Sequence, residues 1–222
     1  MAKIVGIAGE AGAGKDTFAQ PLVERGFVKA SFAGNLKEMC QYIFGLSPYH
    51  TDTQEGKLEK LTVPVPFTKI HFNKIIQWIT RTHDIRACTA QLTAVEKKYI
   101  VNQIKREGRP LYFRTPREVL QFVGTEICRA VHENYHAEVL YTKIISSNMK
   151  WVITDVRFPN ERAMVKKLGG VLVRIKRPGF IQMGLNTAHA SEASLGADTE
   201  YDVLVNNTGT IQDLHKATEQ FV

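Results

Sequence analysis

The feature that most constrains this chain is an apolar run, Ile4–Ala8, followed directly by the glycine-rich stretch Gly9–Thr17. The run predicts a buried strand, and the pattern over Lys15–Arg25 predicts a helix. A strand, a glycine-rich turn and a helix N-terminus in this order form a loop whose backbone N–H groups bind nucleotide phosphates. The alternative is a glycine-rich turn that binds nothing, and the strand and helix that flank the loop argue against it.

Two side chains of this loop are expected to carry chemistry. Lys15 follows the last glycine and is expected to reach the β and γ oxygens of a nucleotide. Asp16 stands where Ser or Thr usually ligates Mg²⁺, so it departs from the usual pattern.

Length, charge and cysteine content narrow the class of protein. The 222 residues suffice for one large domain with its own core. The net charge of +7 indicates an anionic partner. Because the basic residues form no long run, a small phosphorylated ligand is favoured over stable binding of nucleic acid.

The three cysteines, Cys40, Cys88 and Cys128, are widely spaced, which predicts reduced thiols rather than disulfides or a zinc site. No apolar run approaches the roughly 18 residues of a membrane span, so a soluble, intracellular protein is expected.

Strand-like runs bounded by turn residues recur along the chain, with helical patterns between most of them. They lie at Ile4–Ala8, Phe27–Phe32, Trp151–Thr154, Val171–Ile175 and Val203–Val205. This alternation is typical of a parallel sheet covered by helices. We therefore expect a single α/β domain over residues 1–222 with the three-layer P-loop NTPase fold and a central parallel sheet of about five strands.

An all-helical insertion between sheet elements is expected at about residues 46–112, where two prolines interrupt the alternation. Helical patterns follow near His71–Thr82 and Thr93–Arg106, and the second opens on a capping box of Thr93 and Glu96. Whether this insertion forms a homodimer is left open by the sequence.

Another predicted helix follows the second strand. Asn35 is expected to cap it and Gly45 to end it. Lys37 lies in its first turn, close to the end of that strand.

The stretch that begins at Thr115 predicts a helix with two different faces. Thr115, Pro116 and Glu118 form a strong helix start. Because an α-helix turns by about 100° per residue, the apolar residues of this stretch fall on one face. The opposite face is expected to carry Arg117, Gln121, Gly124, Thr125 and Cys128. A guanidinium fork suits a monophosphate, and an exposed charge is the alternative for this arginine. If a nucleotide binds here, the Gln121 amide could contact a base edge and Thr125 the sugar or base, while the glycine leaves room for a ligand.

Two further segments predict parts of a phosphoryl-transfer site. Val152–Asp155 resembles a Walker B strand, so Asp155 is expected to hold Mg²⁺ directly or through water. Residues from about 177 to 201 are rich in small and polar types and predict a mobile lid. Arg177 at its start is expected to stabilise charge on the transferred phosphoryl group.

Taken together, these blocks resemble the deoxynucleoside monophosphate kinases of bacteriophages. The resemblance rests on GEAGAGKDT at 9–17, SFAGNLK at 31–37, TPREVLQFVGTE at 115–126, TDVRFPNE at 154–161, and His189–Glu192 followed by the Asp202–Asn207 block. The GKDT variant is a feature of that family, so Asp16 supports the resemblance. The family often has a Trp downstream of the Thr115 helix, where this chain offers Tyr135 or His136.

The resemblance implies ATP on the loop and a deoxynucleoside monophosphate beside it, with Mg²⁺. The implied ATP contacts are Ala11, Gly12, Ala13, Gly14, Lys15, Asp16 and Thr17. The implied monophosphate contacts are Lys37, Arg117, Gln121, Gly124, Thr125 and Glu161. The catalytic groups would be Lys15, Asp16, Arg117, Asp155, Arg157 and Arg177, with Asp16 and Asp155 at the metal. The implied reaction yields a nucleoside diphosphate and ADP for DNA synthesis, in the host cytoplasm if a phage encodes the chain.

Two other functions are compatible with the loop alone. One is a P-loop kinase with a non-nucleotide acceptor, of the dephospho-coenzyme A or shikimate kinase type, which would have no use for Gln121 and Thr125 in base recognition. The other is a nucleic-acid-binding NTPase that uses the positive charge. Neither a helix-turn-helix pattern nor an aromatic RNA-binding signature supports the second.

Overall fold

The computed structural model describes residues 3–82, 88–101, 111–179 and 194–222. The chain forms two compact units, the first made of residues 1–32 and 140–222 and the second of residues 33–139. The second unit is longer than the expected insertion at about 46–112, because it also takes in the Lys37 and Thr115 helices.

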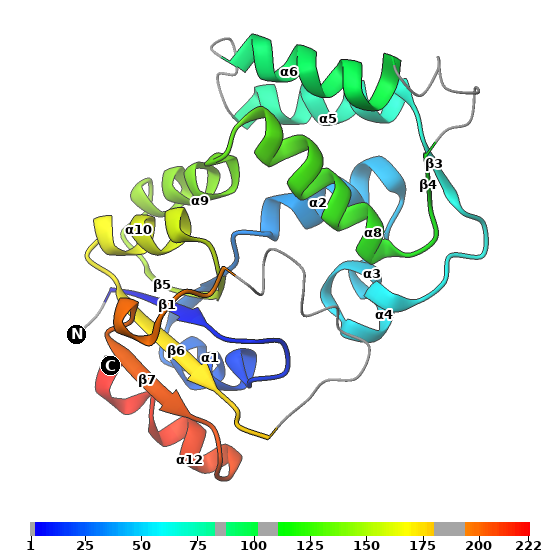
Figure 1. Cartoon of the computed structure of the whole chain (residues 1–222). Coiled ribbons are helices and arrows are strands. Elements are labelled where there is room, and N and C mark those ends of the chain that lie inside the picture. Colours follow the sequence, from blue (N-terminus) through cyan, green and yellow to red (C-terminus); the bar gives the residue numbers. More distant parts are fainter. Residues whose placement is uncertain (1–2, 83–87, 102–110, 180–193) are drawn as a thin grey trace. The chain divides into compact units, whose positions relative to one another are not determined.

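Unit 1 contains a five-stranded sheet in the order β2-β5-β1-β6-β7. Its strands are β1 (Ile4–Ala8), β2 (Phe27–Ala30), β5 (Lys150–Val156), β6 (Val171–Lys176) and β7 (Val203–Asn206). Figure 1 shows two neighbouring strands of this sheet, β6 and β7, side by side. Each neighbouring pair is parallel. The central parallel sheet predicted from the sequence is therefore confirmed, with β2 ending two residues earlier than expected.

Helices cover both faces of this sheet, which gives the expected three layers. They are α1 (Lys15–Glu24), α10 (Pro159–Lys167) and α12 (Ile211–Lys216). Alternate residues of β1 separate the two faces. Val5 and Ile7 share a core with Phe18 of α1 and Leu214 of α12, whereas Gly6 lies against Val165 of α10. Gly6 is small enough to let α10 pack closely.

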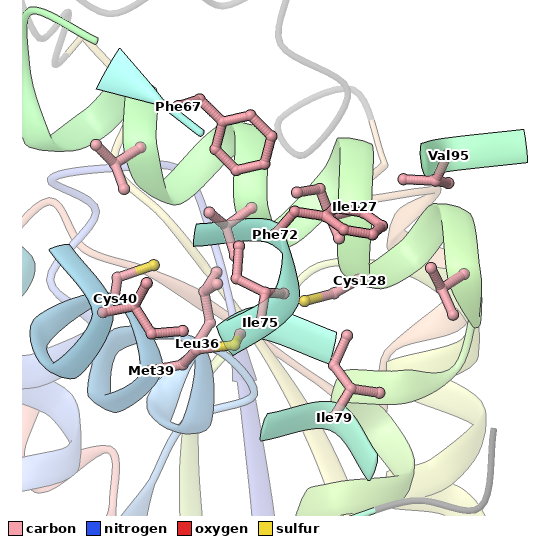
Figure 2. Packing of buried hydrophobic residues seen from close by; sticks show 14 of the residues in the cluster. Leu36, Met39, Cys40, Phe67, Phe72, Ile75, Ile79, Val95, Ile127 and Cys128 are labelled. Carbon is pink, nitrogen blue, oxygen red and sulfur yellow. The ribbon is translucent and has the colours of Figure 1, made fainter. Parts of the chain in front are cut away.

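Unit 2 is mainly helical. Its helices are α2 (Gly34–Phe44), α3 (Pro48–Asp52), α4 (Gln54–Leu58), α5 (Lys69–Thr82), α6 (Thr89–Glu96), the π-helix η2 (Lys97–Val101), α8 (Pro116–Gln121), the π-helix η3 (Phe122–Arg129), and α9 (Tyr135–Ile145), of which residues up to Val139 belong to this unit. Figure 2 shows its core, where Leu36 and Met39 of α2 and Ile75 of α5 belong to one apolar cluster with Phe67 and Cys128.

The expectation of an all-helical insertion is wrong. β3 (Val65–Phe67) pairs antiparallel with β4 (Leu111–Phe113). Pro66 lies within β3 opposite Tyr112. Proline is read as a strand breaker because it cannot donate to a ladder, but a two-stranded ribbon has only edge strands, and each can place a proline on its outer side.

Two predicted helix caps are also wrong. α6 begins at Thr89, so Thr93 lies inside the helix and forms no capping box with Glu96. α2 begins at Gly34 after Ala33, so Asn35 is inside the helix. Other predicted ends are confirmed, since Gly45 ends α2 with a φ of 68°. Thr115 caps α8 in a capping box, in which its side chain accepts from the Glu118 N–H and the Glu118 side chain accepts from the Thr115 N–H.

Candidate functional site

The glycine-rich loop joins β1 to α1, and its backbone needs glycine at several positions. Gly12 and Gly14 have φ values of 76° and 98°, in the region that other residues rarely adopt. A Cβ on Gly9 would lie 2.5 Å from the carbonyl oxygen of Ile175 in the neighbouring strand. Within the described residues no side chain caps the start of α1, so its first N–H groups remain oriented toward the loop. This is the geometry of an anion site at a helix N-terminus.

The Lys15 ammonium lies over the beginning of the same loop. Its Nζ donates to the carbonyl oxygens of Gly9 and Glu10, each at 2.7 Å. The cation predicted to contact phosphates is therefore already held at the loop. The other predicted contacts, Ala11, Gly12, Ala13 and Thr17, lie in this loop or in the first turn of α1.

The two predicted metal ligands both belong to unit 1, and each already has a polar partner. Asp16 is 77% exposed and pairs with Lys29 of β2 at 2.7 Å. The Asp155 Oδ1 accepts a hydrogen bond from the Phe32 N–H at 2.7 Å. In the ranges that the structure describes, no group of three or more His, Cys, Asp or Glu side chains is arranged to hold a metal. Both side chains are carboxylates, the ligand type that suits Mg²⁺, which takes one or two protein carboxylates and completes its shell with phosphate oxygens and water.

The turn after β5 presents Arg157 and is held from two sides. Glu161 is 2% exposed. Its Oε2 accepts from the N–H groups of Arg157 at 2.8 Å and Phe158 at 3.1 Å. Arg162, which sequence reasoning missed, donates from Nη1 to the carbonyl oxygens of Arg157 at 2.7 Å and Ser194 at 2.8 Å. Glu161 was predicted to contact the monophosphate. In the structure it anchors the Arg157 turn, and its role toward a ligand remains a prediction.

Arg177 follows β6 directly. Its Nη1 lies 3.4 Å from the carbonyl oxygen of Gly12, so this arginine reaches the glycine-rich loop within unit 1. The His189–Glu192 block and most of the expected lid at 177–201 lie outside the described residues.

In unit 2, Lys37 and Arg117 come to the same short segment although they are far apart in sequence. The Lys37 ammonium pairs with Asp52 at 2.9 Å. The Arg117 Nη2 donates to the side-chain oxygen of Gln54 at 3.0 Å. Asp52 ends α3 and Gln54 begins α4, so the partners of the two predicted phosphate-binding cations are only two positions apart in the chain. Sequence reasoning missed both partners, because nothing local marks them.

The helix that carries Arg117 changes type at Phe122, and beyond that point the prediction that Cys128 lies on the polar face is wrong. Cys128 was expected on that face with Gln121, but it is fully buried in the core. A π-helix bonds i to i+5, so residues no longer advance by 100° and other positions share a face. Gln121 and Thr125 are half-buried.

Gly124 is buried at this change of helix type. A Cβ there would lie 2.7 Å from the Leu36 side chain. Leu36 thus occupies the room expected for a ligand beside this glycine. The Gly124 carbonyl oxygen is 3.3 Å from the His136 Nε2.

The two residues offered in place of the family's Trp are both buried. The Tyr135 hydroxyl accepts from the Asn35 amide at 2.7 Å and lies 3.1 Å from the Thr82 hydroxyl. Trp78 Nε1 donates to the Asn35 side-chain oxygen at 3.0 Å. Burial raises the pKa of Tyr135 to about 12. Burial, together with Arg129, lowers the pKa of His136 to about 4, so its imidazole is neutral. Both side chains are therefore parts of the core.

Comparisons with known proteins show which family this sequence resembles. A family model described as deoxynucleotide monophosphate kinase matches residues 67–218. A protein of Acanthamoeba polyphaga mimivirus named "Putative deoxynucleotide monophosphate kinase" is 30% identical over 227 residues, which cover 96% of this chain and 92% of the relative. The deoxynucleoside-5'-monophosphate kinase of Escherichia phage T5 is 27% identical over 237 residues, which cover 96% and 93%.

A dephospho-CoA kinase from Campylobacter jejuni covers 97% of this chain at 13% identity, with a TM-score of 0.40. That similarity is too low to support a conclusion about this chain. Among the described residues, none of the helices is both long and apolar enough to cross a bilayer. Because the family model matches more than half of the sequence and the viral relative aligns over nearly all of it, the chain belongs to the deoxynucleotide monophosphate kinase family.

Proposed function

We propose that this protein transfers the γ-phosphoryl group of ATP to a deoxynucleoside 5'-monophosphate, giving the diphosphate and ADP. The observation that carries the proposal is the pair of cationic groups, one in each unit. Lys15 lies at a glycine-rich loop in unit 1, and Lys37 and Arg117 gather at the α3–α4 junction in unit 2. A kinase needs one anion site for the donor and one for the acceptor. The reaction would supply precursors for DNA synthesis in the cytoplasm.

The donor half uses the loop of unit 1. Backbone N–H groups at the start of α1 bind the phosphates of ATP, and Lys15 exchanges the carbonyls of Gly9 and Glu10 for the β and γ oxygens. Asp16 and Asp155 would hold Mg²⁺, which would neutralise charge on those phosphates when bound.

The acceptor half uses the cations of unit 2. The Arg117 guanidinium has a planar fork that matches two oxygens of a monophosphate, while Lys37 adds a point charge. Gln54 already holds one nitrogen of that fork, which limits its rotation. Gln121 and Thr125, half-buried further along the same helix, are the candidates for contacts with the base and sugar.

The transfer step needs no covalent intermediate. Charge builds on the oxygens of the moving phosphoryl group, and Arg157 and Arg177 of unit 1 are the side chains proposed to stabilise it. The Glu161 and Arg162 contacts fix the turn that carries Arg157, so less reorganisation is required during the reaction.

An ADP-release assay tests this function. Purified protein receives ATP and Mg²⁺ with each deoxynucleoside monophosphate in turn, then with the ribonucleoside monophosphates, dephospho-coenzyme A and shikimate. At least one deoxynucleoside monophosphate is expected to stimulate ADP formation well above the rate without acceptor. Stimulation only by a non-nucleotide acceptor would instead identify the alternative type of P-loop kinase. ADP formation that no acceptor changes would contradict both.

A further inference from the structure

The Asp202–Asn207 block contributes to the family resemblance but has no role in the site described above. Its strand, β7, is fastened to β6 at both ends. Asp202 Oδ2 accepts from the Leu172 N–H at 2.7 Å, and the Asn207 N–H donates to the Lys176 carbonyl at 2.7 Å. The position at which β7 ends, and hence the position of the Asn207 side chain, is fixed by the sheet.

From this fixed position Asn207 reaches the glycine-rich loop. Its Nδ2 donates to the Ala13 carbonyl oxygen at 3.0 Å. A Cβ on Gly14 would lie 2.7 Å from the same nitrogen and 3.1 Å from Leu214 Cδ2. The Ala13–Gly14 peptide therefore rests directly against Asn207, separated from it by 194 positions in sequence.

This contact fixes more than one carbonyl. A peptide group is planar and trans, so its C=O and the N–H of the next residue point in opposite directions. Holding the Ala13 oxygen toward Asn207 turns the Gly14 N–H to the opposite side of the peptide, away from Asn207. A glycine loop is flexible, and without a fixed carbonyl this peptide could rotate at Gly14.

We propose that Asn207 is a positioning residue for the donor nucleotide, because it holds the Ala13–Gly14 peptide so that the Gly14 N–H is directed at a phosphate of ATP. The inference deepens the proposed function and rests on it. Asn207 itself does not contact the phosphate. It acts by restricting the loop before ATP binds, so that less conformational entropy is lost on binding.

Calorimetric titration with ATP and with ADP tests the proposal on three variants and the unchanged protein. Asn207→Ala removes the donor, and Asn207→Asp keeps the shape but replaces the donor with a second acceptor. Asn206→Ala is the matched control, because Asn206 is the adjacent, exposed residue. Asn207→Ala is expected to weaken ATP binding about tenfold, the effect of one lost hydrogen bond. Asn207→Asp should weaken it further, because the carboxylate repels the Ala13 carbonyl oxygen and the nucleotide. Asn206→Ala should bind within about twofold of the unchanged protein.

Kinetics separate positioning from general damage. With Asn207→Ala the KM for ATP should rise while the KM for the monophosphate stays the same. An unchanged ATP affinity would overturn the proposal, as would a variant that loses affinity for both substrates in proportion to a lowered Tm. If the unchanged protein itself binds neither ATP nor ADP, the proposed function fails as well. This outcome is seen without any variant, so it differs from a failure of the Asn207 proposal alone, in which the unchanged protein binds ATP and the variant binds it equally well.

Discussion

The two groups of candidate residues differ in how the chain assembles them. In unit 1 the phosphate loop is contiguous, running from Gly9 to Thr17, and its shape depends on glycine backbone angles. In unit 2 Lys37, Asp52, Gln54 and Arg117 come from four separate helices, and their arrangement depends on side-chain contacts. The contiguous group can be recognised from its spacing, whereas the dispersed group exists only once the unit has folded. Substitutions should therefore act differently in the two units.

The largest effect is expected at Lys15. Lys15→Met should lower kcat/KM for ATP about 10³-fold, because the variant lacks the charge proposed to contact the transferred phosphoryl group. Steady-state kinetics at varied ATP provide the measurement, and Lys3→Met, at an exposed position of the same unit, is the control. A decrease of less than about tenfold would mean that Lys15 stays on its loop carbonyls during the reaction.

A second prediction concerns the core of unit 2. The pKa of His136 is about 4 in the fold, lowered by burial and by Arg129, against 6.5 for an imidazole in water. Between these values the unfolded chain binds a proton that the folded chain does not, so stability must fall as pH is lowered from 6.5 toward 4. The loss approaches about 3 kcal/mol at the lower end.

Urea unfolding across this pH range measures the loss. His136→Gln retains an amide donor for the Gly124 carbonyl but does not titrate, so its stability should vary less with pH than that of the unchanged protein. Parallel pH profiles for the two proteins would show that His136 is protonated in the fold as readily as in the unfolded chain.

The dispersed group can be tested with a double-mutant cycle. Arg117→Ala should lower kcat/KM for the monophosphate about 10²-fold and leave ATP affinity unchanged. Gln54→Ala should have an effect of about fivefold, because it removes only the hydrogen bond that positions the guanidinium. Adding Gln54→Ala to Arg117→Ala should then change little. Arg114→Ala, on an exposed neighbour, serves as the control. If the effects of the two substitutions on kcat/KM add, Gln54 does not act through Arg117.

Two glycines of unit 1 test how far stability and ATP binding depend on the backbone conformation of the loop. Gly14 and Gly26 have similar φ values, 98° and 88°. Of the two, only Gly14 has other atoms within 4 Å of the position that a Cβ would occupy. Gly26→Ala should cost about 1 kcal/mol from backbone strain alone. Gly14→Ala should cost about 2 kcal/mol and also weaken ATP binding, because Asn207 must move away from Ala13. Chemical denaturation and ATP titration measure the two quantities. Equal losses of stability would indicate that the Asn207 contact adds nothing.

The smallest effect on stability is expected at Asp16. Its ion pair with Lys29 is exposed, so Asp16→Ser should change the free energy of unfolding by less than about 1 kcal/mol. The Mg²⁺ concentration for half-maximal activity should nevertheless shift if Asp16 orients the metal. Identical Mg²⁺ titrations would remove Asp16 from the metal site.

The correct and incorrect sequence predictions follow the same division. The strand positions and the Thr115 cap depend on residues close in sequence, and they are confirmed. The errors arise where distant contacts override a local pattern. Asn35 could have capped α2, but its amide instead bonds Tyr135 and Trp78. Cys128 was assigned to a polar face because the π-helix at Phe122–Arg129 has no signature in the sequence.

By itself the sequence determined that this chain has a phosphate loop, a parallel sheet of alternating strands and helices, and the motifs of its family. These are set by local spacing, backbone propensity and hydrophobic period. Only the tertiary structure decided that Gln54 and Asp52 accompany Arg117 and Lys37, and that Asn207 holds the peptide before Gly14. Such contacts depend on the packing of elements far apart in the chain, and no local pattern records which elements will meet.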